Sequence, residues 1–303
     1  MSKADLISKL KNVIHRSGFP LELKIGSILE RNKWSYTISN LYEDFETGKL
    51  READIVAQKR INQIEVQLFI ECKKSEDKQV LLYSPKHQEV GPLWNSSLKI
   101  FPKLTFGKNL SDSPFKIYNE LGNLMLFNNE IPTAKSLIVT KGEVVTQDNI
   151  AFLSAINGII KKSIHVASNG HTRTGHRYLF LYVLIFDGSL LQLTSSKTED
   201  FDLKEISYGK YTYKHLFQFA PEYQLNKNHV MSTTVEFGEE FLIELMNPEK
   251  FDEYIQNLDL AMNKVNHENI KSWGVDFPSL KKIKFKLDRI LNNPQTKDGS
   301  TSD

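Results

Sequence analysis

The chain has 303 residues, of which 40% are hydrophobic, and this is enough apolar material for a sizeable buried core. Its 39 Lys and Arg nearly balance 37 Asp and Glu, so the net charge of +2 does not by itself indicate a nucleic-acid-binding protein. The longest strongly apolar run, at 178–186, is shorter than the roughly 18 to 20 residues that span a bilayer. A single cysteine, Cys72, excludes an internal disulfide framework and a CxxC metal or redox motif. The first 16 residues are amphipathic rather than signal-like, so we expect a globular cytoplasmic protein with no membrane partner.

Two helices are predicted at the start of the chain. Apolar residues from Leu6 to Ile14 follow the i, i+3, i+4, i+7 spacing of a helix, which Ser17 and Gly18 end. A second helix begins at Pro20, which suits a first helical turn, and carries Glu22 in that turn. Two interpretations of Glu22 stay open, a surface acid favoured by the helix dipole or an acid directed at a neighbouring sheet.

Three strands are predicted to follow as a meander. Residues 34–45 have the β-branched and aromatic content of a strand, ETGK at 46–49 supplies a turn, and 51–58 return as the next strand. The third strand, 64–73, alternates between apolar and polar positions, which places Glu71 and Lys73 on the same face.

The last two strands are predicted to bring two acids together. With Asn62 and Gln63 as a two-residue turn, Asp54 lies directly opposite Glu71. Two carboxylates about 5 Å apart at Cβ repel each other unless a proton or a divalent cation lies between them, and oxygen ligands suit Mg²⁺ or Mn²⁺. Lys73, on the same face, can balance the negative charge or stabilise charge that develops on a phosphate.

These residues resemble the PD-(D/E)XK nuclease superfamily, which has the restriction-endonuclease-like fold. The resemblance covers about residues 18–75 and lies in GFPLE, READIVA and FIECKKS, taken with the order of the predicted elements. Asp54 corresponds to the motif aspartate, and Glu71, Cys72 and Lys73 to the (D/E)XK element. Ala53 stands where the superfamily often has proline, a departure that touches no ligating atom.

The resemblance implies a role for each of these residues. It implies that Asp54 and Glu71 ligate Mg²⁺, with Mn²⁺ as a substitute, and that the backbone carbonyl of Cys72 joins them. Glu22 would be an outer-shell metal ligand with a part in catalysis, and Lys73 would assist the attack of water on a phosphodiester.

The resemblance also implies a function, a DNA endonuclease connected with restriction or phage defence. Its partner would be double-stranded DNA, and it would act as a homodimer or as a subunit of a defence complex. Two alternatives stay open. The chain could be an inactive nuclease-fold protein that binds nucleic acid or serves as a structural subunit. The three charged residues could also form an ion pair at a sheet edge, since D…ExK patterns arise by chance in charged proteins.

The rest of the chain is predicted to alternate between strands and helices. Asp187-Gly188 is a strong hairpin signal between two strands, and residues 238–246 are predicted as a helix. The other predicted strands are 80–85, 136–140 and 229–237, and the other predicted helices are 113–127, 147–163, 249–268 and 277–292.

The predicted fold class is α/β, a restriction-endonuclease-like core in which a mixed central sheet is flanked by helices, with an extended sheet and C-terminal helices. We expect residues 1–247 to form the nuclease-like domain and 248–291 a helical extension. The polar residues 292–303 are expected to be a disordered tail.

Overall fold

The computed structural model describes residues 3–44, 47–62, 64–84, 133–145, 149–168, 177–195, 201–218 and 236–264. The helices in these ranges are α1 (Lys3–Arg16), α2 (Phe19–Arg31), α4 (Asn149–Ser168) and α5 (Pro248–Lys264). The strands are β1 (Ser35–Glu43), β2 (Leu50–Ile61), β3 (Ile64–Ser84), β4 (Thr133–Ala134), β5 (Ser136–Lys141), β6 (Val144–Val145), β7 (Arg177–Ser195), β8 (Phe201–Glu205), β9 (Tyr208–Gln218) and β10 (Glu236–Met246). No helix of the described part is long and apolar enough to cross a membrane.

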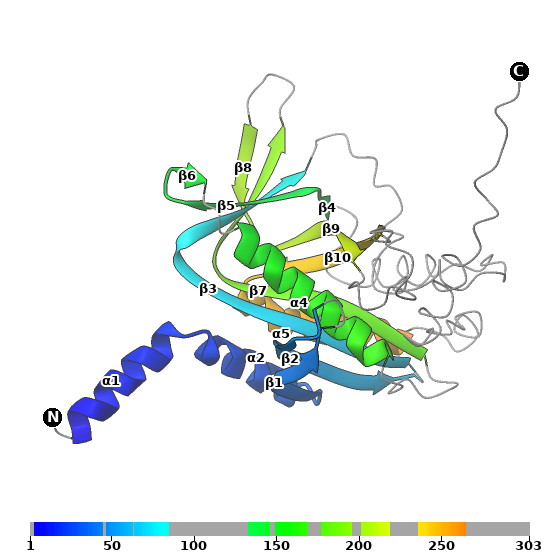
Figure 1. Cartoon of the computed structure of the whole chain (residues 1–303), viewed down its shortest axis with the longest axis horizontal. Coiled ribbons are helices and arrows are strands. Elements are labelled where there is room, and N and C mark those ends of the chain that lie inside the picture. The colour runs from blue at the N-terminus through cyan, green and yellow to red at the C-terminus, as the bar shows by residue number, and fades with distance from the viewer. Residues whose placement is uncertain are drawn as a thin grey trace, which may run out of the picture.

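All the strands belong to one mixed sheet of ten strands, which confirms the predicted α/β class. Its main order is β1-β2-β3-β7-β10-β9-β4, while β5 and β8 pair with β3 and β7 and β6 pairs with β5. The centre of the sheet is the parallel pair β3 and β7, two long, curved strands that lie side by side (Figure 1). Their first halves pair with β2 and β10, and their second halves with β5 and β8.

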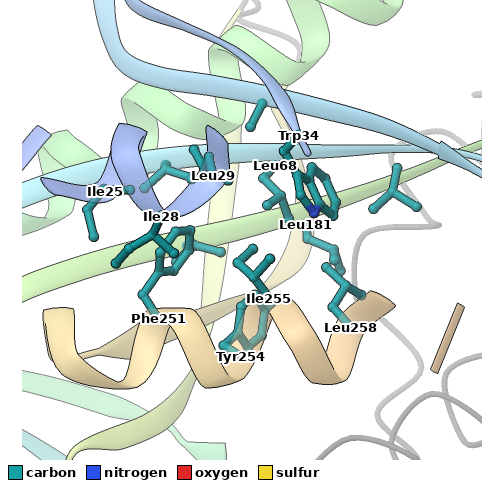
Figure 2. Close-up of a cluster of buried hydrophobic side chains, with 14 of the residues drawn as sticks. Ile25, Ile28, Leu29, Trp34, Leu68, Leu181, Phe251, Tyr254, Ile255 and Leu258 are labelled. Atoms are coloured by element: carbon teal, nitrogen blue, oxygen red, sulfur yellow. The ribbon is translucent and has the colours of Figure 1, made fainter. Parts of the chain in front are cut away.

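Helices cover both faces of the sheet because each face presents apolar side chains. On one face, residues of α2 and α5 pack against alternate residues of β2, β3 and β7, as Figure 2 shows for Leu29, Leu68, Leu181 and Ile255. On the other face, α4 packs against Phe69, Tyr182 and their neighbours. Helix α5 therefore contributes directly to the main core. The predicted domain division at 247–248, which falls between β10 and α5, stays a prediction.

The hairpin between β2 and β3 has the predicted register. Ile61 lies opposite Ile64 and Ile55 opposite Ile70. Asn62 has φ of 47°, a left-handed conformation of the kind that a two-residue hairpin turn requires. Its side-chain amide donates hydrogen bonds to the carbonyl oxygens of Met262 and Asn263, at 3.0 and 3.1 Å, at the end of α5. The turn that sets the register is thus anchored to the core helix.

Two predictions on the later elements were wrong. The chain does not reverse at Asp187-Gly188, because β7 continues through these residues and pairs in parallel with β3 on both sides of them. Residues 238–246 belong to strand β10 rather than a helix. The C-terminal part of β10 is buried on both faces between β7 and β9, and a strand in that position shows no alternation of apolar and polar residues.

The remaining predicted elements divide into confirmed and undescribed ones. Strands near 34–45, 51–58, 64–73 and 136–140 and helices near 6–14, 20–31, 147–163 and 249–268 are present. Residues 80–84 are a strand but continue β3 instead of starting a new element. The predicted helices at 113–127 and 277–292, the predicted tail at 292–303 and most of the predicted strand at 229–237 lie outside the described residues.

A bulge interrupts the pairing of β3 with β7 close to its middle. Lys74 pairs with Asp187 and Gln79 with Ser189, so four residues of β3 lie opposite the single residue Gly188. A Cβ atom at Gly188 would lie 2.7 Å from the backbone oxygen of Ser75 and 2.5 Å from the ring of Phe186. The backbone of the bulge therefore packs directly on Gly188, where no side chain fits.

We expect Gly188→Ala to lower the free energy of unfolding by about 1–3 kcal/mol, because the added methyl group overlaps a backbone oxygen that cannot move without shifting β3. Denaturant unfolding measures the change. Gly158→Ala is the matched control: Gly158 lies inside α4 and an added Cβ would meet only the Tyr42 hydroxyl, at 3.9 Å. That substitution should raise stability by about 0.5–1 kcal/mol, the gain expected from helix propensity. Equal effects of the two substitutions would contradict the close packing at the bulge.

Candidate active site

The candidate site lies where β2 and β3 part. Their ladder ends at the pair Ile55 and Ile70, and β3 takes up its next partner on that edge, β5, only at Lys78. Asp54 and Glu71 come next in the β2–β3 register. Instead of a further backbone bond, the Asp54 carboxylate accepts a hydrogen bond from the backbone N–H of Cys72, at 2.8 Å. The side chain of Asp54 thus closes the ladder and is fixed beside β3.

Glu71 and Lys73 point the same way, as the alternation of the strand predicted. The Lys73 ammonium lies 2.8 Å from Oε1 of Glu71 and 3.9 Å from Oδ2 of Asp54. Glu71 is buried, with 8% of its surface exposed, while Asp54 and Lys73 are half-buried. The structure therefore brings together the two acids and the lysine that the sequence singled out, with the ammonium in contact with both carboxylates.

Glu22 lies close enough to this cluster to interact with it electrostatically. It occupies the first turn of α2, which begins at Phe19 with Pro20 as its second residue. Burial raises the pKa of Glu22, and the negative charges of Asp54 and Glu52 raise it further, while Lys73 lowers it. Both interpretations of Glu22 stay open, because its carboxylate is affected by the charges on β2 and also lies beside Gly18 at the start of α2.

Glu52 is a further acid of the site that the sequence analysis missed. It is exposed near the start of β2, and its charge raises the pKa values of both Glu22 and Asp54. A usable signal was present, because residues two apart in a strand are neighbours on one face and Glu52 stands two residues before Asp54.

Cys72 takes part through its backbone alone. Its side chain is buried in the core under α2 and α5, and burial, followed by the charges of Asp54, Glu22 and Glu71, raises the pKa of its thiol. In a strand, the N–H and C=O of one residue point to the same neighbouring strand. Because the N–H of Cys72 bonds to Asp54, its carbonyl oxygen is also directed toward the edge where the acids lie.

The electrostatics of the cluster show a surplus of negative charge. Burial raises the pKa of Glu71 to about 7, although Lys73 opposes this shift, and burial also raises the pKa of Asp54 against Lys73 and the Cys72 N–H. Burial lowers the pKa of Lys73, but Glu71 and Asp54 together raise it by more. One ammonium thus offsets only part of the cost of gathering these acids.

The donor set suits a hard divalent cation. Asp54 and Glu71 supply carboxylate oxygens and Cys72 a carbonyl oxygen, which are the ligand types that Mg²⁺ and Mn²⁺ prefer. Among the described residues, no three or more His, Cys, Asp and Glu side chains are arranged as a metal site. The Lys73 ammonium is the cation that the two carboxylates contact here, and a metal bound between them would have to displace it from Glu71.

No family model, no curated protein and no solved structure matches this chain. Any functional conclusion therefore depends on the chemistry of the site itself.

The raised pKa of Glu71 predicts how stability depends on pH in the absence of metal. Between pH 4.5 and about 7 the folded protein retains a proton on Glu71 that the unfolded chain has lost. The stabilisation is therefore complete below pH 4.5 and is lost as the pH rises through 7, by up to about 3 kcal/mol. Glu71→Gln should remove this loss, so that the variant gains stability relative to the wild type as the pH rises.

Urea unfolding from pH 4.5 to 8 in EDTA measures this difference. Glu65→Gln, on the same strand and face but at the far end of the β2–β3 ladder, is the control. Parallel stability curves for Glu71→Gln and the wild type would show that Glu71 does not carry the raised pKa.

Proposed function

We propose that this protein is a Mg²⁺-dependent nuclease with a restriction-endonuclease-like core. The observation that carries the proposal is the meeting of Asp54, Glu71 and Lys73 at the point where β2 and β3 separate. Ion pairs that serve stability alone rarely gather several acids around one lysine at an open strand edge, whereas catalytic sites commonly do. The order of elements also supports it: α2 with Glu22, then β1, β2 with Asp54 and β3 with Glu71 to Lys73.

The residues divide into those that would hold the metal and one that would act on the phosphate. Asp54, Glu71 and the Cys72 carbonyl would bind Mg²⁺, or Mn²⁺ in its place, and Glu22 would contribute from the outer shell. A bound divalent ion would neutralise negative charge on the phosphodiester and make a water molecule more acidic. Lys73, released from Glu71 by the metal, would stabilise charge that develops on the phosphate.

Double-stranded DNA in the cytoplasm is the substrate that we propose, in restriction or phage defence. A homodimer or a larger defence complex would be the acting form. With a net charge of only +2, attraction to DNA would depend on local positive charge and on the bound metal rather than on the whole protein.

A second candidate is a nuclease-fold protein that does not cut and that serves as a binding or structural subunit. The observation that favours it is the short contact between Lys73 and Glu71, which gives each group a partner of opposite charge without a metal. The two candidates differ in whether metal binding and cleavage depend on the same carboxylates.

Asp54→Ala and Glu71→Ala should each slow cleavage by about 10³-fold or more while the protein stays folded, because each removes a metal ligand and reduces repulsion between the acids. The measurement is cleavage of plasmid, linear and single-stranded DNA and of RNA with Mg²⁺, Mn²⁺ or EDTA, together with calorimetric metal titration. Glu65→Ala, outside the site, is the control. If the two variants bind Mn²⁺ and cut like the wild type, the assignment is wrong. If the wild type neither binds metal nor cuts, the non-catalytic subunit gains support.

Lys73→Met should reduce the single-turnover rate by about 10²-fold or more, while the affinities for DNA and Mg²⁺ change much less. Methionine keeps the length of the side chain and removes the charge that would meet the transition state. Lys74→Met is the matched control, because Lys74 is the next residue of β3 but is exposed and, by the alternation of the strand, lies on the opposite face from Lys73. Loss of activity through weakened DNA binding alone would make Lys73 a substrate-positioning residue instead.

A further inference from the structure

We infer that Asn247, which lies outside the acid cluster, is a positioning residue for Lys73. The inference rests on the proposed function for its effect on the rate, but not for its effect on the position of the side chain. Asn247 follows the last residue of β10 and precedes Pro248, the first residue of α5. Its side chain is directed at β7, two strands away from the site's acids on β2.

The side chain of Asn247 continues the pairing of β7 after β10 has ended. The parallel ladder of β10 and β7 ends at the pair Met246 and Ile185. Beyond it, the amide nitrogen of Asn247 donates hydrogen bonds to the carbonyl oxygens of Phe186, at 2.9 Å, and Gly188, at 2.8 Å. One side chain thus holds two carbonyl groups of β7 at residues two apart, as a neighbouring strand would.

Asn247 is itself fixed by backbone bonds on both sides. Its N–H donates to the carbonyl oxygen of Ser207, at 2.9 Å, and its carbonyl oxygen accepts from the N–H of Lys250, at 3.0 Å, in the first turn of α5. The amide therefore extends from a rigid junction between the sheet and the helix, and it can hold β7 in place.

The two residues that Asn247 holds are those that set the course of β3 at the site. Phe186 is paired with Lys73, and Gly188 packs under the backbone oxygen of Ser75, where the bulge of β3 begins. The position at which β3 leaves the register of β7 therefore depends on the two carbonyl groups that Asn247 binds. β3 leaves that register directly after Lys74. The two hydrogen bonds from Asn247 to β7 therefore fix the backbone from which the Lys73 ammonium reaches Glu71 and Asp54.

The Lys73 ammonium lies 2.8 Å from Glu71 but 3.9 Å from Asp54. A small shift of the Lys73 backbone would therefore change its distances to the two carboxylates. A misplacement of about 1 Å that originates away from the reacting atoms can reduce a rate by as much as 10²-fold. Loss of the two hydrogen bonds from Asn247 to β7 should therefore act on catalysis through Lys73, without any contact between Asn247 and the substrate.

The test compares Asn247→Ala with Asn257→Ala. Asn257 is a matched control because its amide also donates to a backbone carbonyl, that of Glu253 at 2.7 Å, but within α5 and away from β7. Asn247→Ser, which retains one donor, is a milder variant that serves if Asn247→Ala does not fold. Each substitution is made in the wild type and in Lys73→Met, and single-turnover cleavage is measured at saturating DNA.

We expect Asn247→Ala to slow cleavage by about 10-fold or more in the wild type and to have little further effect in Lys73→Met, because its effect passes through that lysine. Asn257→Ala should leave the rate unchanged in both backgrounds. Independent, multiplicative effects of Asn247→Ala and Lys73→Met, or a normal rate for Asn247→Ala, would overturn the inference.

A second measurement uses the metal-free protein and needs no activity. Acetic anhydride labelling, followed by mass spectrometry, compares Lys73 with its neighbour Lys74. Asn247→Ala should raise the labelling of Lys73 relative to Lys74 by about two- to fivefold, the factor for loss of one modest ion pair, and Asn257→Ala should not. If the wild type cuts no nucleic acid, the proposed function fails. The labelling ratio then decides the positioning role alone: a raised ratio supports it, and an unchanged ratio overturns it.

Discussion

The parallel pairing of β3 with β7 is the constraint on which the rest of the structure depends. It runs along almost the whole of both strands, and it places Glu71 to Lys74 on the central strand of the sheet. On the outer edge of β3, β2 and β5 each cover only part of its length, so among the described strands the edge is open between Ile70 and Lys78. An open edge in the middle of a rigid strand lets polar groups reach solvent while their backbone stays fixed, which is what a catalytic site requires.

The protonation of the acids at this edge is set by opposing effects, of which burial is the largest. Burial disfavours the ionised forms of Asp54 and Glu71, while the Lys73 ammonium and the Cys72 N–H favour them. Removing either opposing contribution would shift the protonation of the cluster. A divalent cation would favour the ionised acids more strongly than the lysine does, so metal affinity should increase as the pH rises through the pKa of Glu71, about 7.

The sequence predicted the part of the fold that contains the site, because the signals there are local. A period of two in β3 assigned Glu71 and Lys73 to one face, and a short turn at Asn62 fixed the register that brings Asp54 next to Glu71. The predictions failed where a distant partner decides the conformation. Asp187-Gly188 is a turn signal in isolation, but the long partner strand β3 keeps β7 extended through it. The contact of Asn247 with β7 depends on residues about sixty positions apart, and no local pattern indicates it.

The same sheet contains a second buried acid and lysine, which can be compared with the candidate site. Glu244 of β10 lies directly opposite Lys210 of β9, and the two side chains are 5% and 3% exposed. Burial raises the pKa of Glu244, and the charge of the one lysine opposite it, Lys210, lowers it. At the edge of β3, the ammonium of Lys73 lowers the pKa values of three acids, Glu22, Asp54 and Glu71, and the charge of Glu52 raises those of Glu22 and Asp54. A pair of one acid and one base has no such surplus. The larger number of acids than lysines at this edge is the difference from the Glu244 and Lys210 pair, and it is the reason that we propose a divalent cation there.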